Sequence, residues 1–111
     1  MAQLVSITFD CENPRALAAF WSAVLHRDIA DDASEFHAML PGRPNWVFLK
    51  VPEPKTAKNR MHVDLDCADL EAERTRFESL GASFVHEKHE FGLRWMTFRD
   101  PEGNEFCAAA H

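Results

Sequence analysis

Two stretches of the sequence decide the fold: SerIleThrPheAspCysGluAsn at 6–13 and HisValAspLeuAspCysAlaAsp at 62–69. Both contain an AspCys pair, and they lie half of the 111-residue chain apart. Each runs into a helical pattern, which ends near 26 in the first copy and near 81 in the second. Self-similarity at a fixed spacing is typical of an internal duplication. The sequence therefore predicts one domain, 1–111, made of module one at about 1–54 and module two at about 58–111.

Each copy begins with a strand that has one apolar and one polar face. Side chains alternate between the two faces of a strand, so every second residue shares a face. The apolar sides of the two predicted strands carry Val5, Ile7 and Phe9, then Met61, Val63 and Leu65. Their polar sides carry Ser6, Thr8 and Asp10, then Arg60, His62, Asp64 and Asp66. Cys11 and Cys67 continue the apolar sides, which predicts two small core residues.

A helix and three further extended runs follow each first strand. Asn13 and Asp69 are typical N-caps, and Gly81 suits the left-handed residue that ends a helix, a position that His26 occupies in the first copy. The predicted extended runs are 27–31, 35–40 and 45–52, then 82–88, 92–99 and 104–109. This pattern predicts an α+β fold of two βαβββ modules. We expect the helices to cover the apolar faces of mixed, mainly antiparallel sheets, and the polar faces to line a cupped cleft. A ferredoxin-like sandwich without duplication is the structural alternative.

Composition limits the classes of function. A hydrophobic fraction of 46% in 111 residues supports one core. A net charge of −6 disfavours nucleic acid as a partner. The sequence shows neither an apolar run of the ~20 residues needed to cross a bilayer nor a signal-peptide pattern, so we expect a cytoplasmic protein without a membrane partner. The three widely spaced cysteines suggest free thiols rather than disulfides.

His62 is the main candidate for catalysis. Asp64 lies two residues away on the same strand face, where a carboxylate can orient an imidazole that acts as a general acid or base. The alternative is a structural histidine that is hydrogen-bonded to a carboxylate of a neighbouring strand. We expect Lys58 and Arg60 to bind an anionic or carbonyl substrate, with Cys107 also facing the cleft.

The two strand tryptophans, Trp46 and Trp95, are candidate substrate contacts, although their spacing leaves a place in the core open. His86 and His89 are three apart, which on a strand directs them to opposite faces and argues against a metal site.

Three segments, at 9–21, 55–65 and 100–107, resemble the vicinal-oxygen-chelate superfamily, and its glyoxalase-like domain subgroup in particular. That superfamily includes glyoxalase I, extradiol dioxygenases and bleomycin resistance proteins. The resemblance implies paired βαβββ modules around a U-shaped cleft, often completed by a homodimer. It also implies metal ligands on the first and last strands of each module, where His62 matches. The other positions depart from the pattern, because they hold Ser6, Cys107 and either Leu49 or Lys50.

Two functions follow as expectations. The first is a glyoxalase-like enzyme of the lyase, isomerase or dioxygenase type, with a degraded or absent metal site. The second is a protein that binds a small molecule, such as an antibiotic, without transforming it. We expect no cofactor; a divalent metal would have only His62 and Cys107 as ligands. The expected partners are a small molecule and a second copy of the chain.

Overall fold

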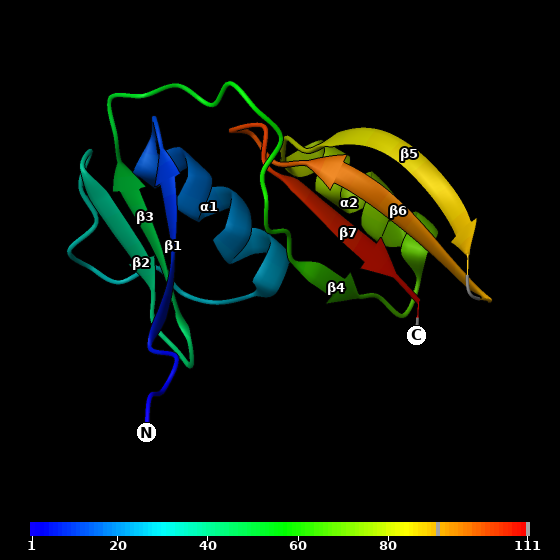
Figure 1. The fold of residues 1–111 in the computed structure, drawn as a ribbon, viewed down its shortest axis with the longest axis horizontal. Coiled ribbons are helices and arrows are strands. Elements are labelled where there is room, and N and C mark those ends of the chain that lie inside the picture. The colour runs from blue at the N-terminus through cyan, green and yellow to red at the C-terminus, as the bar shows by residue number, and fades with distance from the viewer. Residues whose placement is uncertain (91, 111) are drawn as a thin grey trace. The chain divides into compact units, whose positions relative to one another are not determined.

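The computed structural model describes residues 1–90 and 92–110, which form two compact units. The first unit is Met1–Lys55 and the second begins at Thr56, inside the link predicted at 52–59. Figure 1 labels their helices and strands. In the described part of the chain, neither helix is long and apolar enough to cross a membrane.

The first unit contains one helix and a three-stranded sheet. Its elements are β1 (Ser6–Cys11), α1 (Pro14–Leu25), β2 (His37–Leu40) and β3 (Asn45–Lys50). The sheet order is β1-β3-β2, with β1 parallel and β2 antiparallel to β3. A parallel pair needs a crossover, and α1 lies within the segment that makes it.

The core of the first unit is aromatic and lies between α1 and one sheet face. Phe9 of β1 stacks on Trp46 and Phe48 of β3 with ring centroids 5.3 and 5.4 Å apart. Trp21 of α1 is buried and lies 5.2 Å from Trp46. The alternation predicted for the first strand therefore directs its apolar side to the helix.

The ends of α1 follow the predicted signals. Asn13 Oδ1 accepts a hydrogen bond from the amide of Ala16 at 3.2 Å, and His26 ends the helix with φ 54°. The strand predicted at 27–31 is absent, although Ala30 donates one backbone hydrogen bond to Met39 at 2.9 Å. Aspartates at 28, 31 and 32 explain the difference, because Asp is poorly suited to strands and favours turns.

The second unit has the predicted βαβββ order. Its elements are β4 (Asp64–Asp66), α2 (Leu70–Leu80), β5 (Ser83–Glu90), β6 (Leu93–Arg99) and β7 (Glu105–Ala109). The sheet order is β4-β7-β6-β5; β4 runs parallel to β7, and the other neighbours are antiparallel. The α+β class with two repeated modules is thus confirmed, with one strand fewer in the first module.

Phenylalanines join α2 to its sheet. Phe77 lies edge-on to Phe98 of β6 and Phe106 of β7, with centroids 5.4 and 5.7 Å away. All three are essentially inaccessible to solvent. Because α2 covers this face of the sheet, the alternate residues of β6 and β7 lie on the opposite face.

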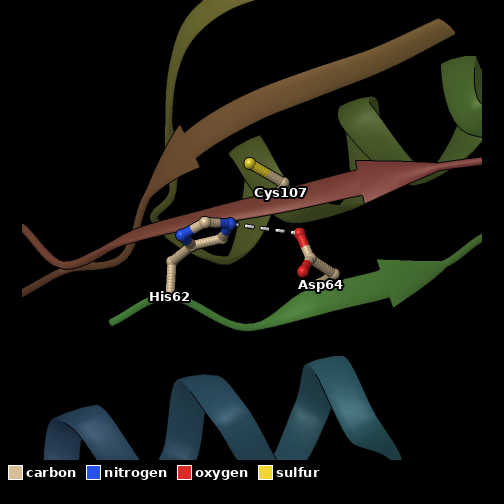
Figure 2. A group of neighbouring side chains, drawn as sticks. All are labelled: His62, Asp64 and Cys107. Atoms are coloured by element: carbon tan, nitrogen blue, oxygen red, sulfur yellow. Dashed lines mark ion pairs between the residues drawn. The ribbon is translucent and has the colours of Figure 1, made fainter. Parts of the chain in front are cut away.

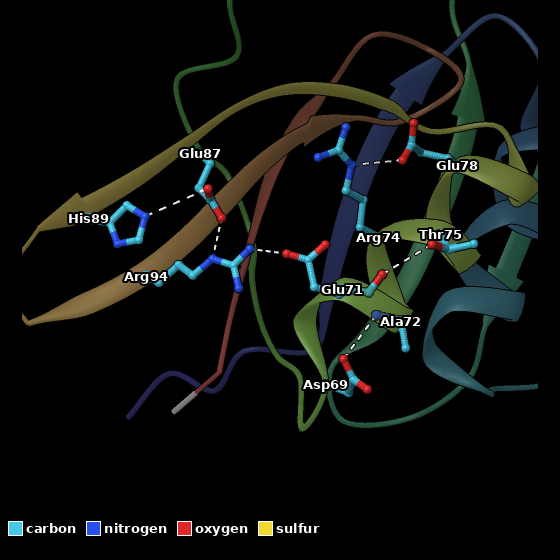
Figure 3. Close-up of polar contacts among 9 residues, drawn as sticks. All are labelled: Asp69, Glu71, Ala72, Arg74, Thr75, Glu78, Glu87, His89 and Arg94. Carbon is cyan, nitrogen blue, oxygen red and sulfur yellow. Dashed lines mark hydrogen bonds and ion pairs between the residues drawn. The ribbon is translucent and has the colours of Figure 1, made fainter.

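Charged contacts on the surface add to this packing (Figure 3). Arg94 of β6 contacts Glu87 on β5 and Glu71 on α2, and so links the β5–β6 hairpin to the helix. The hydrogen bond from Arg94 lowers the pKa of the Glu87 carboxyl below its ordinary value. The Arg74 guanidinium lies 3.7 Å from the ring centre of Phe84 on β5, a second contact between helix and strand.

Candidate functional site

The face of the second sheet opposite α2 carries a hollow of about 450 Å³. Its lining residues come from β4 to β7 and from the segment before β4. They are Lys58, Asn59, His62, Asp64, Leu65, His86, Lys88, Leu93, Trp95, Thr97, Glu105, Cys107, Ala108 and Ala109. The size suits a small molecule.

The segment before β4 is held against β7, which fixes the position of His62. Regular β4 is shorter than the strand predicted at 60–66, but its pairing continues: Cys107 donates its amide to the carbonyl of Val63 at 3.0 Å. Farther back, Asn59 binds the backbone of Glu105 through both ends of its amide. Its Oδ1 accepts from the Glu105 N–H at 2.9 Å, and its Nδ2 donates to the Glu105 carbonyl at 3.2 Å.

His62, Asp64 and Cys107 form a compact group in the hollow (Figure 2). His62 Nε2 lies 3.3 Å from Asp64 Oδ1. One potential ligand atom from each of the three residues falls within 4.8 Å of the other two. The strand register explains the group, since Asp64 and Cys107 are partners in the β4–β7 pair. The His62 and Asp64 side chains are 52% and 70% exposed, so a ligand can reach both.

Cys107 differs from the other two cysteines in its surroundings. Its Sγ lies 3.4 Å from Oγ1 of Thr97, a buried residue directly across on β6. Cys11 and Cys67 are buried, as predicted for core residues, and burial raises the pKa of the Cys67 thiol. Cys107 is thus the thiol that the structure brings to the candidate site.

Of the two cations predicted to bind substrate, Lys58 lines the hollow and Arg60 does not. Lys58 lines the hollow and is 75% exposed, with its Nζ 3.8 Å from Glu105 Oε1. Arg60 is exposed and does not belong to the hollow as the structure describes it. One predicted cation, Lys58, is therefore in place to meet a ligand.

The two candidate tryptophans lie in different environments. Trp95 is half-buried in the hollow, across from Ala109 and Lys88. Trp46 is only 8% exposed, and it packs on Phe9 and Trp21 in the core of the first unit. Its place on the helix-covered face means that it makes no part of the candidate site, contrary to the expectation of a substrate contact.

Sequence reasoning missed several lining residues, chiefly His86, Lys88 and Thr97. His86 and Lys88 are two apart on β5, opposite Thr97 and Trp95 on β6. Period-two alternation within 83–90 was the available signal: it places His86 and Lys88 on one face. They add basic groups to a hollow that also holds Lys58.

The donor atoms present can fit a divalent metal. Imidazole nitrogen, carboxylate oxygen and thiolate sulfur are all established protein ligands, and Asp64 supplies a third ligand beyond the predicted His62 and Cys107. Ser6 and Leu49 lie on strands of the first unit, where Ser6 Oγ accepts a hydrogen bond from Asn45 at 3.4 Å and Leu49 offers no side-chain donor atom. The chemical fit therefore rests on the second unit.

A family model described as "Glyoxalase-like domain" matches residues 6–109. No curated protein sequence matches the chain.

Solved structures share its fold at low identity. A glyoxalase/bleomycin resistance protein/dioxygenase family enzyme from Burkholderia phytofirmans PsJN is 16% identical, covers 98% of each chain and gives a TM-score of 0.80. A glyoxalase-related enzyme from Fulvimarina pelagi is 13% identical over 100% of this chain and 89% of its own, with a TM-score of 0.78. Lactoylglutathione lyase from Agrobacterium tumefaciens is 17% identical over 99% and 94%, with a TM-score of 0.68. The resemblance to the vicinal-oxygen-chelate superfamily is confirmed, and the chain belongs to the glyoxalase-like domain family.

Proposed function

We propose that the protein is a small-molecule enzyme of the glyoxalase-like family, with His62 as its acid/base group. The observation that carries the proposal is the His62–Asp64 pair, 3.3 Å apart on the open side of a hollow of about 450 Å³. A carboxylate beside an imidazole orients the ring, which helps the ring to accept and return a proton at a fixed position. Asp64 is thus the positioning partner of His62.

The lining supports an anionic carbonyl compound as the substrate class. Lys58 and Lys88 supply positive charge, and His86 adds a further donor. Leu93 and Trp95 supply apolar surface for the remainder of a small molecule. In such a site the cations hold the carboxylate or polarise the carbonyl, while His62 removes a proton from the adjacent carbon. This division of roles requires no residue beyond those of the hollow.

Proton exchange tests the chemistry before a natural substrate is identified. Pyruvate is incubated with the protein in D₂O, and loss of its methyl proton signal is followed by NMR. We expect exchange faster than in buffer, roughly 10²-fold or more slower on His62→Ala, and partly reduced on Asp64→Asn. His89→Ala is the matched control, because His89 is an exposed β5 histidine that contacts Glu87. Catalysed exchange that survives His62→Ala would contradict the proposal.

Sequestration without chemistry is the second candidate function, favoured by the half-buried Trp95 in the hollow. Saturable quenching of Trp95 fluorescence by pyruvate, with exchange no faster than in buffer, would support it over catalysis. Trp46→Phe removes one of the two first-unit tryptophans that would otherwise mask the signal. A cytoplasmic location and a homodimer stay predictions from the sequence.

A further inference from the structure

We propose that the β5–β6 side of the hollow binds the carboxylate and the ring of an aromatic acid, with Lys88 and Trp95 as the residues that select it. The inference deepens the proposed function and rests on it for one point, the place of the reacting carbon beside His62. It names a substrate whose acid group and reacting carbon lie at opposite ends of a flat ring. Three features of the hollow support it: the distribution of charge, the indole of Trp95 and the width of the sheet.

The carboxylates of the hollow lie on one side of it. Among the described lining residues they are Asp64 on β4 and Glu105 on β7, and the lining residues from β5 and β6 include no acidic side chain. The Glu105 side chain is 16% exposed, and its Oε1 lies 3.8 Å from Lys58 Nζ, so it offsets charge on that lysine. A substrate carboxylate is therefore repelled from the β4–β7 side and attracted to the β5–β6 side.

Lys88 is the cation that the β5–β6 side offers to such a carboxylate. It is exposed and lines the hollow. Its neighbour Glu87 binds Arg94 instead (Figure 3). Within the described part of the chain, no acidic side chain forms an ion pair with Lys88. A ligand carboxylate at this ammonium group thus displaces water and does not compete with an anion of the protein.

Trp95 supplies a flat apolar surface beside this cation. The strand register places it directly opposite Lys88 on one side and Ala109 on the other, and the methyl group of Ala109 is too small to cover an indole. Trp46 lies 5.2 Å from another ring, whereas none of the rings that the structure describes lies against Trp95. Leu93 adds apolar surface to the same lining. Because aromatic rings favour offset stacking, a benzene ring suits this place.

The width of the sheet separates Lys88 from the reacting group. The order β4-β7-β6-β5 puts three strand spacings, ~14 Å, between Asp64 and Lys88. Asp64 is opposite Cys107 on β7. Lys88 is level with Ala109, two residues farther along β7, which adds ~7 Å in the strand direction. The backbones of Asp64 and Lys88 are therefore ~16 Å apart, more than twice the length of an extended lysine side chain.

A rigid spacer between the acid group and the carbonyl fits this separation. In pyruvate the carboxylate is bonded directly to the carbonyl carbon, so one molecule cannot reach Lys88 and His62 together. In 4-acetylbenzoate a benzene ring separates the two groups and can lie on Trp95. The acetyl methyl then faces His62, as the proposed removal of a proton requires. A hollow of about 450 Å³ has room for one such molecule.

Affinities of matched ligands for the full chain, measured by calorimetry, test the inference without any variant. We expect 4-acetylbenzoate to bind roughly threefold or more tightly than acetophenone, which lacks the carboxylate. It should exceed 4-acetylcyclohexanecarboxylate, which lacks the flat ring, by a similar factor of roughly three or more. Acetophenone bound as tightly as 4-acetylbenzoate, equal affinities for the two acids, or no saturable binding of 4-acetylbenzoate would each overturn the inference.

Substitutions at position 88 then assign the charge. Lys88→Gln should abolish the preference for 4-acetylbenzoate over acetophenone, and Lys88→Arg should retain most of it because it keeps a cation there. His89→Gln is the matched control, since His89 is the next residue of β5 and contacts Glu87; its preference should equal that of the parent. Circular dichroism checks that each variant is folded. A preference that survives in folded Lys88→Gln would overturn the inference.

Proton exchange of the acetyl methyl group in D₂O separates this inference from the proposed function. We expect exchange on bound 4-acetylbenzoate that is lost in His62→Ala. Lys88-dependent binding without exchange would contradict the acid/base role of His62 and still support the carboxylate site. Pyruvate exchange that depends on His62, together with no preference for 4-acetylbenzoate over acetophenone, would overturn the carboxylate site alone.

Discussion

Replacing Asn59 by Ala should loosen the segment that carries Lys58 and His62. Asn59 joins this segment to β7 by two hydrogen bonds with the backbone of Glu105, at 2.9 and 3.2 Å. Its Nδ2 also contacts the carbonyl of Met61, which closes a turn just before His62. Alanine removes all of these contacts and adds none.

The size of the effect follows from the two bonds to Glu105. Each typically contributes ~0.5–1.5 kcal/mol to stability, so their loss should lower the free energy of unfolding by ~1–3 kcal/mol. Water can reach the half-buried Glu105, which keeps the cost from rising further. Protection of the Glu105 amide against hydrogen exchange should fall by roughly 5- to 150-fold, the same free energy expressed as a ratio.

Hydrogen exchange read by NMR at single amides measures this loss locally. The Cys107 amide is the internal control, because its acceptor is the Val63 backbone carbonyl, which the substitution leaves in place. Asn59→Asp is the matched variant: it keeps an acceptor for the Glu105 N–H but cannot donate to the Glu105 carbonyl. Equal protection of Glu105 in Asn59→Ala and the parent, with less than about 0.5 kcal/mol lost in urea unfolding, would refute the reasoning.

Three further perturbations test the fold. Phe77→Ala should cost ~3–5 kcal/mol in thermal unfolding, because it leaves a cavity between α2 and the sheet. His26 and Gly81 both have positive φ, 54° and 114°, which glycine adopts more easily than other residues. His26→Gly should therefore raise the free energy of unfolding by about 1 kcal/mol, and Gly81→Ala should lower it by a similar amount. Two changes in stability of the same sign would contradict the argument. Because the pKa of Glu87 is lowered in the folded protein, its ionised carboxyl stabilises the fold at pH values above the ordinary pKa of that group. This stabilisation is lost as the pH falls through the lowered pKa. The difference in Tm between the parent and Glu87→Gln should therefore be present at neutral pH and disappear in acid.

Local signals allowed much of the fold to be predicted. The repeat at 6–13 and 62–69, the caps Asn13 and Asp69 and the left-handed Gly81 each depend on interactions between residues close in sequence. The segment 27–31 was predicted wrongly as a strand, because its two aspartates favour turns over strands. The strand predicted at 60–66 is also longer than the observed β4, Asp64–Asp66. In the segment before β4, the side-chain amide of Asn59 accepts the Glu105 N–H in place of regular backbone pairing.

The site depended on information that lies between strands. His62 and Asp64 were identified from alternation within one strand, but the approach of Cys107 depends on the register of β4 against β7. The sequence could not assign Trp46 and Trp95 to the core or to the hollow, because each lies on a strand with one covered and one open face. Only pairing with Phe9 in one case and Ala109 in the other resolves their positions.

The alternation along β7 has an evolutionary consequence. Phe106 packs on Phe77 of α2 and Ala108 is buried, while Cys107 between them lines the hollow. Selection can therefore change the side chain at this one position of the strand while the neighbouring residues keep their places in the core. A lineage that exchanged Cys107 for another donor would acquire a different chemistry at little structural risk, which makes this residue a natural starting point for engineering new activities.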